Sequence, residues 1–266
     1  MKLSQNLKLA IDASLLAGKK ILEIYTSDNF IVEYKSDESP LTLADKSSDE
    51  IIKNALKLSN IPILSEEGDT LDYDKRRDLK HLWIVDPLDG TKEFIKKNDE
   101  FTVNIALVEN QKPILGVIYA PALSLLYFSE ENFGSYKLDL NDSISNEIDF
   151  NKALKLPIAR NKTKYSVVTS RSHLDKETLS YIENLKNIRL NVESIAIGSS
   201  LKFCLLAEGT ADCYPRFSPC MEWDTAAGKI ICKEVGFEVI DQMTEKEIIY
   251  NRENLLNNSF IAKKSI

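Results

Sequence analysis

Residues 83–91, WIVDPLDGT, constrain the fold of this chain more than any other stretch. The apolar residues at its start favour a buried strand, and the Asp-Pro and Asp-Gly pairs that follow indicate that the strand ends in a turn. Two aspartates, Asp86 and Asp89, therefore stand at a strand end. An ordinary turn explains them, but α/β proteins also tend to bind ligands at such ends. The rest of the chain decides between the two interpretations.

The composition is that of a globular protein, with 43% hydrophobic and 28% charged residues. A chain of 266 residues is long enough for one large domain or two smaller ones. The formal net charge is −7, from 41 acidic and 34 basic residues, and long-range attraction to a polyanion would have the wrong sign. We therefore expect a small-molecule ligand and no general binding of nucleic acid.

The first 25 residues carry apolar side chains at helical spacing, which predicts a surface helix with one buried face. Asp12 interrupts the apolar stretch that a signal peptide would need. No stretch approaches the ~18 consecutive apolar residues of a membrane span, so we expect no integral membrane segment and a cytoplasmic location. The four cysteines lack both zinc-site spacing and the density of a disulfide framework, and we expect reduced, structural thiols. They are Cys204, Cys213, Cys220 and Cys232.

The pattern along the chain predicts two subdomains that meet near residue 150, in the polar stretch DLNDSISNEIDFN. Before this boundary, two helices precede an antiparallel set of strands that begins with WIVDPLDGT. After it, strands alternate with helices, which is typical of an α/β arrangement. The expected helices of this second part lie in DKETLSYIENLK, SLKFCLLAEG and WDTAAGKIICKEVGF.

Four acidic residues share one context, because each stands where an apolar segment stops. They are Glu66, Asp86, Asp89 and Asp224. Mg²⁺ prefers carboxylate and carbonyl oxygens and leaves positions open for substrate phosphate. Asp86 and Asp89 could ligate adjacent cations, and the Leu88 carbonyl between them could supply another oxygen. Such an arrangement suits phosphoryl transfer with two metal ions.

The two residues that follow, Gly90 and Thr91, fit the same chemistry. Gly90 lets the backbone approach a ligand closely, and Thr91 begins a short helical stretch whose free N–H groups could hold a phosphate. Its hydroxyl can also orient a water molecule. Taken singly, Asp224 is also explained as a helix N-cap, and Glu66 and Glu67 as solvated turn acids. The four acidic positions together are harder to explain as coincidence.

Three stretches resemble the three motifs of the inositol monophosphatase superfamily: the acidic pair Glu66 and Glu67 after a strand, DPLDGT, and WDTAAG. The members of this superfamily are Mg²⁺-dependent, lithium-sensitive phosphatases. The resemblance covers nearly the whole chain. It implies an α/β fold, a layered αβαβα sandwich, with the active site between two subdomains. Residues 1–150 would carry most metal ligands, and residues 151–266 would carry Asp224 and a nucleotide-binding block. It also implies two or three Mg²⁺ ions and inhibition by Li⁺ and Ca²⁺.

The resemblance also assigns roles residue by residue. The metal ligands that it implies are Glu66, Asp86, the Leu88 carbonyl, Asp89 and Asp224. Asp45, in SPLTLAD, and Thr91 match the pair that activates the nucleophilic water in this superfamily. We therefore expect Asp45, Thr91 and Glu66 to take part in catalysis. Glu67 matches the second acid of the motif and ranks below Glu66.

The block GSSLKFCLLAEGTADCYPRFSPCMEWDTAAG resembles the CysQ branch, the 3′(2′),5′-bisphosphate nucleotidases, more than the inositol monophosphatases. The second phosphate of such a substrate needs cationic and hydrogen-bonding partners. By match to the nucleotidase pattern these are Ser199, Lys202 and Arg216, the first two on one face of a predicted helix start. His173, in SRSHL, is a candidate for the adenine. The remaining expected substrate contacts are Gly90, Thr91 and Asp224.

The resemblance implies hydrolysis of the 3′-phosphate of 3′-phosphoadenosine 5′-phosphate to AMP and phosphate, and of its sulfated analogue. Lys202 as a surface lysine, Arg216 as a carboxylate partner and His173 in a local role remain alternatives. So do an inositol monophosphatase, a sugar bisphosphatase and a non-enzymatic phosphonucleotide sensor. The choice between monomer and homodimer stays open, as does peripheral contact with the cytoplasmic side of the inner membrane.

Overall fold

The computed structural model describes residues 1–27, 32–34, 40–68, 71–142, 148–158, 162–172 and 174–265. The helices are α1 (Gln5–Tyr25), α2 (Leu43–Leu56), α3 (Tyr73–Arg76), α4 (Thr91–Ile95), α5 (Lys176–Ile188), α6 (Leu201–Glu208) and α7 (Ala226–Lys233). A seven-stranded sheet contains, in spatial order, β3 (Ile63–Ser65), β4 (His81–Asp89), β5 (Thr102–Glu109), β6 (Lys112–Ala120), β7 (Leu125–Glu130), β8 (Gly134–Asp139) and β9 (Leu154–Lys155). A five-stranded sheet contains β11 (Val192–Ile197), β10 (Tyr165–Ser170), β12 (Cys213–Arg216), β16 (Phe260–Lys264) and β14 (Phe237–Asp241). Two short ribbons pair β1 (Val32–Tyr34) with β2 (Pro40–Thr42), and β13 (Cys220–Met221) with β15 (Leu256–Asn257).

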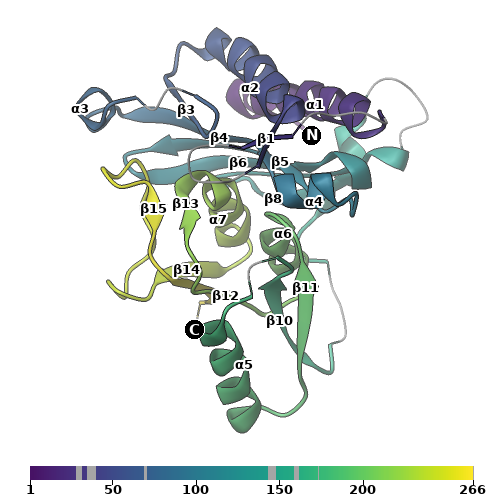
Figure 1. The fold of residues 1–266 in the computed structure, drawn as a ribbon, viewed down its shortest axis with the longest axis vertical. Helices are drawn as coiled ribbons and strands as arrows, with labels where there is room; N and C mark the ends of the chain where they lie inside the picture. Colours follow the sequence, from purple (N-terminus) through teal and green to yellow (C-terminus); the bar gives the residue numbers. More distant parts are fainter. Residues whose placement is uncertain are drawn as a thin grey trace.

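The elements stack in five layers (Figure 1). Helices α1 and α2 cover one face of the seven-stranded sheet, and α6 and α7 lie against its other face. The five-stranded sheet lies beyond α6 and α7, with α5 outermost. The layered αβαβα sandwich expected from the sequence is confirmed.

Strand β4 shows why the strands of the large sheet have almost continuously apolar sequences. Trp83 and Val85 pack in the core under α1 and α2, whereas Leu82 and Ile84 pack in the core with α6 and α7. Successive side chains of a strand point to opposite faces, and both faces of this sheet are covered. The same alternation points Asp86 toward the α6 and α7 layer.

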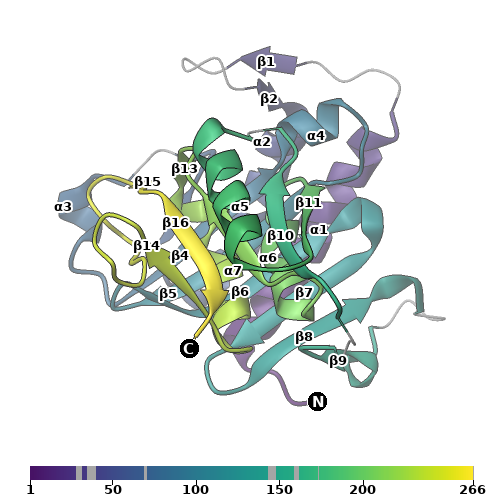
Figure 2. The same ribbon diagram turned by 90° about the horizontal axis from the view of Figure 1, so that it is seen from below.

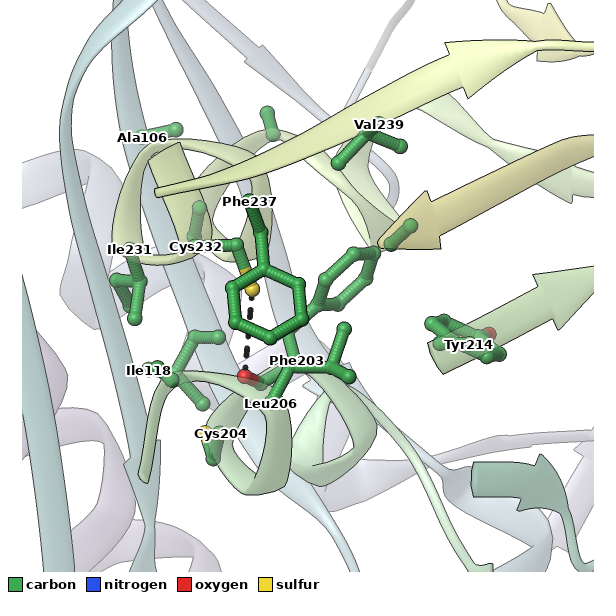
Figure 3. Packing of buried hydrophobic residues seen from close by; sticks show 14 of the residues in the cluster. Ala106, Ile118, Phe203, Cys204, Leu206, Tyr214, Ile231, Cys232, Phe237 and Val239 are labelled. Carbon is green, nitrogen blue, oxygen red and sulfur yellow. Dashed lines mark hydrogen bonds between the residues drawn. The ribbon is translucent and has the colours of Figure 1, made fainter. Parts of the chain in front are cut away.

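The middle layer packs tightly enough to fix the start of α7 against the large sheet (Figure 3). A Cβ added at Gly116 of β6 would lie 2.6 Å from the Ala227 carbonyl oxygen, and one added at Gly228 would lie 2.3 Å from ring carbons of Phe203. The Cys232 thiol contacts the Phe203 carbonyl at 3.4 Å, which joins α7 to α6. The residues just before α7 are therefore held close to the sheet.

The outer layer has its own small core. Figure 2 shows α5 lying over the five-stranded sheet on its outer side. Ile182 and Leu185 of α5 pack against Val167, Cys213 and Ile261 of three neighbouring strands. This layer covers the face of the smaller sheet that points away from α6 and α7.

Most of the predicted elements are confirmed. Strands β4 to β9 form an antiparallel series, and α6 ends at Gly209, whose φ of 78° lies in the left-handed region that glycine adopts most easily. The sequence did not predict β11, β14 and β16, which complete the smaller sheet. The large sheet ends at Lys155 and the small one begins at Tyr165, and the division of the chain near residue 150 stays a prediction.

All four cysteines are buried and unpaired, which agrees with the expectation of structural thiols. In the part of the chain that the structure describes, no helix has the length and apolarity needed to cross a membrane.

Candidate active site

A β-bulge in β4 brings Asp86 and Asp89 to the same face of the sheet. Asp86 pairs with Asn104 of β5 and Asp89 pairs with Thr102, so Pro87 and Leu88 together stand opposite a single residue. In a regular strand, residues three apart point to opposite faces, and one extra residue reverses this relation. The bulge is why this spacing places both carboxylates on the α7 side.

Asp224 comes to the same place from the second half of the chain. It ends the short 3₁₀ helix η5 (Glu222–Asp224), two residues before the start of α7, and its carboxylate accepts a hydrogen bond of 2.8 Å from the Met221 N–H. One carboxylate oxygen each from Asp86, Asp89 and Asp224 lies within 4.8 Å of the others. Burial and the neighbouring carboxylates raise the pKa of Asp86 and Asp224, as expected for like charges gathered in a desolvated site.

Glu66 is placed beside this cluster by strand register. Ser65 at the end of β3 pairs with Val85, and the Glu66 N–H donates to the Val85 carbonyl at 3.1 Å. Glu66 thus follows β3 next to the point where Asp86 follows Val85. Its charge is among those that raise the pKa of Asp86. The predicted grouping of Glu66 with the three aspartates therefore agrees with the geometry.

Asp45 and Thr91, the pair expected to activate the attacking water, contact each other. Asp45 lies in the first turn of α2, where its Oδ2 accepts hydrogen bonds from the Thr42 N–H at 2.7 Å and the Thr42 hydroxyl at 2.6 Å. Its Oδ1 accepts the Thr91 hydroxyl at 3.0 Å. Burial raises the pKa of Asp45, and these hydrogen bonds oppose that effect. The capping bonds hold the carboxylate in one orientation toward Thr91.

Glu66, Asp89 and Asp224 line a cavity of about 390 Å³, whose lining also contains Ser199, Lys202 and Arg216 but not Asp86 or Asp45. Lys202 is only 4% exposed, and its ammonium donates to the Ser199 carbonyl at 2.5 Å. Arg216 donates to the Ser218 and Pro219 carbonyls at 3.1 and 2.9 Å. The Lys202 ammonium also donates to the Ile197 carbonyl at 3.5 Å. An ammonium has three N–H donors and a guanidinium has five, so each cation has more donors than these bonds use. The three residues predicted for a second phosphate therefore share one cavity with Glu66, Asp89 and Asp224.

Gly90 also lines the cavity, with a φ of 93° that favours glycine. A Cβ there would lie 3.1 Å from the Glu100 carbonyl oxygen and 3.3 Å from the Ser199 Cβ. Glycine thus lets the start of α4 approach Ser199 across the cavity. Glu67 lies next to Glu66 but is not among the residues lining the cavity. His173 lies outside the described residues.

The profile of the inositol monophosphatase family matches residues 2–265. The chain belongs to the inositol monophosphatase family.

Two relatives are named 3′(2′),5′-bisphosphate nucleotidase CysQ. The one from Salmonella typhimurium is 42% identical over 248 residues, which cover 92% of this chain and 94% of the relative. The one from Escherichia coli strain K12 is 40% identical over 247 residues, with the same two coverages of 92% and 94%.

Solved structures of inositol monophosphatase family members have the same fold. The crystal structure of CysQ from Bacteroides thetaiotaomicron matches with a TM-score of 0.89 at 49% identity and covers 97% of both chains. The IMPase of Thermotoga maritima matches with a TM-score of 0.75 at 25% identity, over 98% of this chain and 92% of the other.

Two polar residues that orient Asp89 in this family member were not predicted. Asn104 of β5 donates to the Asp89 carboxylate at 3.3 Å and to the Ser200 hydroxyl at 2.9 Å. The Ser200 hydroxyl lies 2.9 Å from both the Asp89 carboxylate and the Asp224 carbonyl. The available signal was a single asparagine within the apolar run FTVNIALV, because a buried amide needs polar partners.

Glu93 of α4 is a further cavity residue that was not predicted from the sequence. It is almost fully buried, and its carboxylate accepts a hydrogen bond from the Ser172 hydroxyl. Arg171, which precedes Ser172 in the chain, donates two hydrogen bonds of 2.6 Å to Glu100. These contacts tie the segment after β10 to α4 and to the segment that follows α4. The position of Glu93, two residues after Thr91, was the only signal.

Proposed function

We propose that this protein hydrolyses the 3′-phosphate of a 3′(2′),5′-bisphosphate nucleotide. The proposed substrate is 3′-phosphoadenosine 5′-phosphate, which would give AMP and phosphate, and the sulfated analogue would give adenosine 5′-phosphosulfate. The observation that carries the proposal is a carboxylate cluster and two cationic side chains in one cavity. The names of the CysQ relatives support it.

We propose that two or three Mg²⁺ ions bind at the carboxylates. The donors would be Glu66, Asp86, the Leu88 carbonyl, Asp89 and Asp224. The donor set fits, because its members are hard oxygen ligands and the oxygens of the three aspartates lie within 4.8 Å of one another. Bound Mg²⁺ would polarise the phosphoryl oxygens and offset the charge that develops during hydrolysis.

Asp45 and Thr91 would position the attacking water. The Thr91 hydroxyl donates a hydrogen bond to Asp45, so its oxygen is available to accept a hydrogen bond from a water molecule. A water held in this way directs a lone pair away from Thr91, toward the phosphorus. Attack forms a bond between the water oxygen and phosphorus and breaks the bond between phosphorus and the 3′-oxygen. The attacking water loses one proton to solvent, and the nucleoside oxygen takes one proton from solvent.

Lys202, Arg216 and Ser199 would hold the phosphate that is not hydrolysed. Charge-assisted hydrogen bonds from an ammonium and a guanidinium suit a phosphate with two negative charges. The cavity lining comes from both sides of residue 150, which supports the proposed division into subdomains 1–150 and 151–266 with the site between them.

The role of Lys202 predicts a pH dependence that a substrate with one phosphate does not share. Burial lowers the pKa of Lys202 to about 8, and Asp89 opposes this shift. The ammonium is charged below this pKa and neutral above it. We expect kcat/KM for the bisphosphate nucleotide, divided by kcat/KM for 3′-AMP, to fall about tenfold between pH 7 and pH 9. A ratio that stays constant over this range would contradict the contact between Lys202 and the second phosphate.

The proposed function is tested by measuring Mg²⁺-dependent phosphate release from three substrates: 3′-phosphoadenosine 5′-phosphate, inositol monophosphate and fructose bisphosphate. We expect kcat/KM for the nucleotide to be at least ~100-fold higher, nearly 3 kcal/mol of discrimination, and to fall in millimolar Li⁺. Preference for inositol monophosphate or the sugar would keep the metal chemistry and reject the nucleotide pocket. Tight nucleotide binding without turnover would identify a sensor.

A further inference from the structure

A buried carboxylate that does not line the cavity lies two residues before Asp224. Glu222 is 0% exposed, and the cavity lining includes its neighbours Met221 and Trp223 but not Glu222 itself. Its carboxylate accepts hydrogen bonds from the Asn251 N–H at 2.6 Å, the Arg252 N–H at 3.1 Å and Arg252 Nε at 3.0 Å. Glu222 therefore ties the turn that carries Asp224 to the segment 251–252.

Arg252 extends this connection to both sides of Asp224. Its Nη2 donates to Asn257 Oδ1 at 2.7 Å. Asn257 Nδ2 in turn donates to the Met221 carbonyl at 2.8 Å and to the Thr225 hydroxyl at 3.1 Å. The backbone before Asp224 and the side chain after it are thus held by one buried amide.

The same network reaches the first half of the chain through Arg76 of α3. Asn251 accepts from Arg76 Nη1 at 2.8 Å and donates to the Arg76 carbonyl at 2.7 Å. Arg76 also donates to the Glu253 carbonyl at 3.2 Å. Arg76 is buried and lies ten residues after Glu66. The bonds therefore join the segment that follows Glu66 to the turn that carries Asp224.

We propose that Glu222, Arg252, Asn257 and the pair Arg76–Asn251 form a positioning network that sets the Asp224 carboxylate for cation binding. The inference rests on the cation site of the proposed function. Repulsion among the carboxylates would push Asp224 away when no cation is present. A turn fixed from behind by buried hydrogen bonds resists this displacement, so less of the free energy of cation binding is lost in reordering the ligand.

The main test is Arg252→Gln, which removes the guanidinium bridge between Glu222 and Asn257. Arg252 lines a second cavity, of about 290 Å³, so a shorter side chain leaves space that water can fill. We expect the dissociation constant for Mn²⁺, measured by electron paramagnetic resonance without substrate, to rise about tenfold. We expect kcat at saturating Mg²⁺ and KM to stay within about threefold of wild type, because Arg252 does not line the active-site cavity.

Three further variants separate positioning from stability. Arg252→Lys keeps one charged donor toward Glu222 and should recover part of the Mn²⁺ affinity. Glu222→Gln keeps the size of the side chain and one acceptor, and it should also weaken Mn²⁺ binding. It replaces Arg252→Gln as the test variant if Arg252→Gln does not fold. Lys233→Gln, at the end of α7, removes an exposed ion pair with Glu131 and should leave Mn²⁺ binding unchanged.

A lower melting temperature of Arg252→Gln and Glu222→Gln with unchanged Mn²⁺ affinity would overturn the inference, because it would show a merely structural network. The Mn²⁺ measurement needs no substrate, so it is independent of the substrate comparison. A wild type that binds Mn²⁺ but hydrolyses no bisphosphate nucleotide would refute the proposed function and leave the positioning network standing.

Discussion

Replacing Asp86 with asparagine is expected to lower kcat/KM by at least about a thousandfold, roughly 4 kcal/mol of transition-state stabilisation. The change keeps the size of the side chain and an oxygen that can still accept the Leu88 N–H, which now lies 3.1 Å from Asp86 Oδ1. It removes the negative charge that we propose to bind Mg²⁺. The measurement is steady-state phosphate release over a range of Mg²⁺ concentrations.

The same substitution is expected to raise the melting temperature of the protein in a chelator. Asp86 is 1% exposed and lies among the carboxylates of Glu66, Asp89 and Asp224, so its charge is both desolvated and repelled. Asparagine removes both penalties. Asp78→Asn, at an exposed position, serves as the control and should change neither kcat/KM nor the melting temperature in a chelator. Wild-type activity of Asp86→Asn would exclude the cation site, and lost activity with lost folding would leave Asp89→Asn as the variant to measure.

The sequence predicts which candidate residues lie close together where these residues stand next to strand ends. Asp86 and Asp89 share a short motif, and the β-bulge that turns them to one face involves only residues within that motif and its neighbouring strand. Asp224 lies two residues before α7, whose apolar and small residues predict a helix. In such cases the residues next to a carboxylate determine where it lies, so the sequence pattern predicts its position.

The sequence does not predict the contacts that orient these carboxylates. Asn104 meets Ser200 across 96 residues, and Arg76 meets Asn251 across 175 residues. No periodicity or spacing links such pairs, because only the packing of the two halves brings them together. For the same reason β16 was missed, since its antiparallel pairing with β12 and β14 depends on chain folding and not on its own short pattern.

Replacing Lys202 with methionine is expected to raise KM for 3′-phosphoadenosine 5′-phosphate by about 10- to 100-fold, the worth of one charge-assisted hydrogen bond. The methionine fills a similar volume, so the buried position next to Tyr214 keeps its packing. 3′-AMP carries the same nucleoside and the same scissile ester but lacks the second phosphate, so its KM should change less than about threefold. The same comparison applies to Arg216→Met.

The matched control is Lys229→Met, because Lys229 is also buried, with 3% exposure, but it donates to the Ile248 carbonyl and pairs with Glu247 outside the active-site cavity. Lys229→Met should lower the melting temperature without changing the ratio of the two KM values. The enzyme substitution and the missing phosphate form a double-mutant cycle, and their coupling isolates the contact. If Lys202→Met raises KM equally for both substrates, Lys202 supports the fold of the cavity and does not bind the second phosphate. A selective loss on the bisphosphate would assign the preference for nucleotides with two phosphates to this side chain.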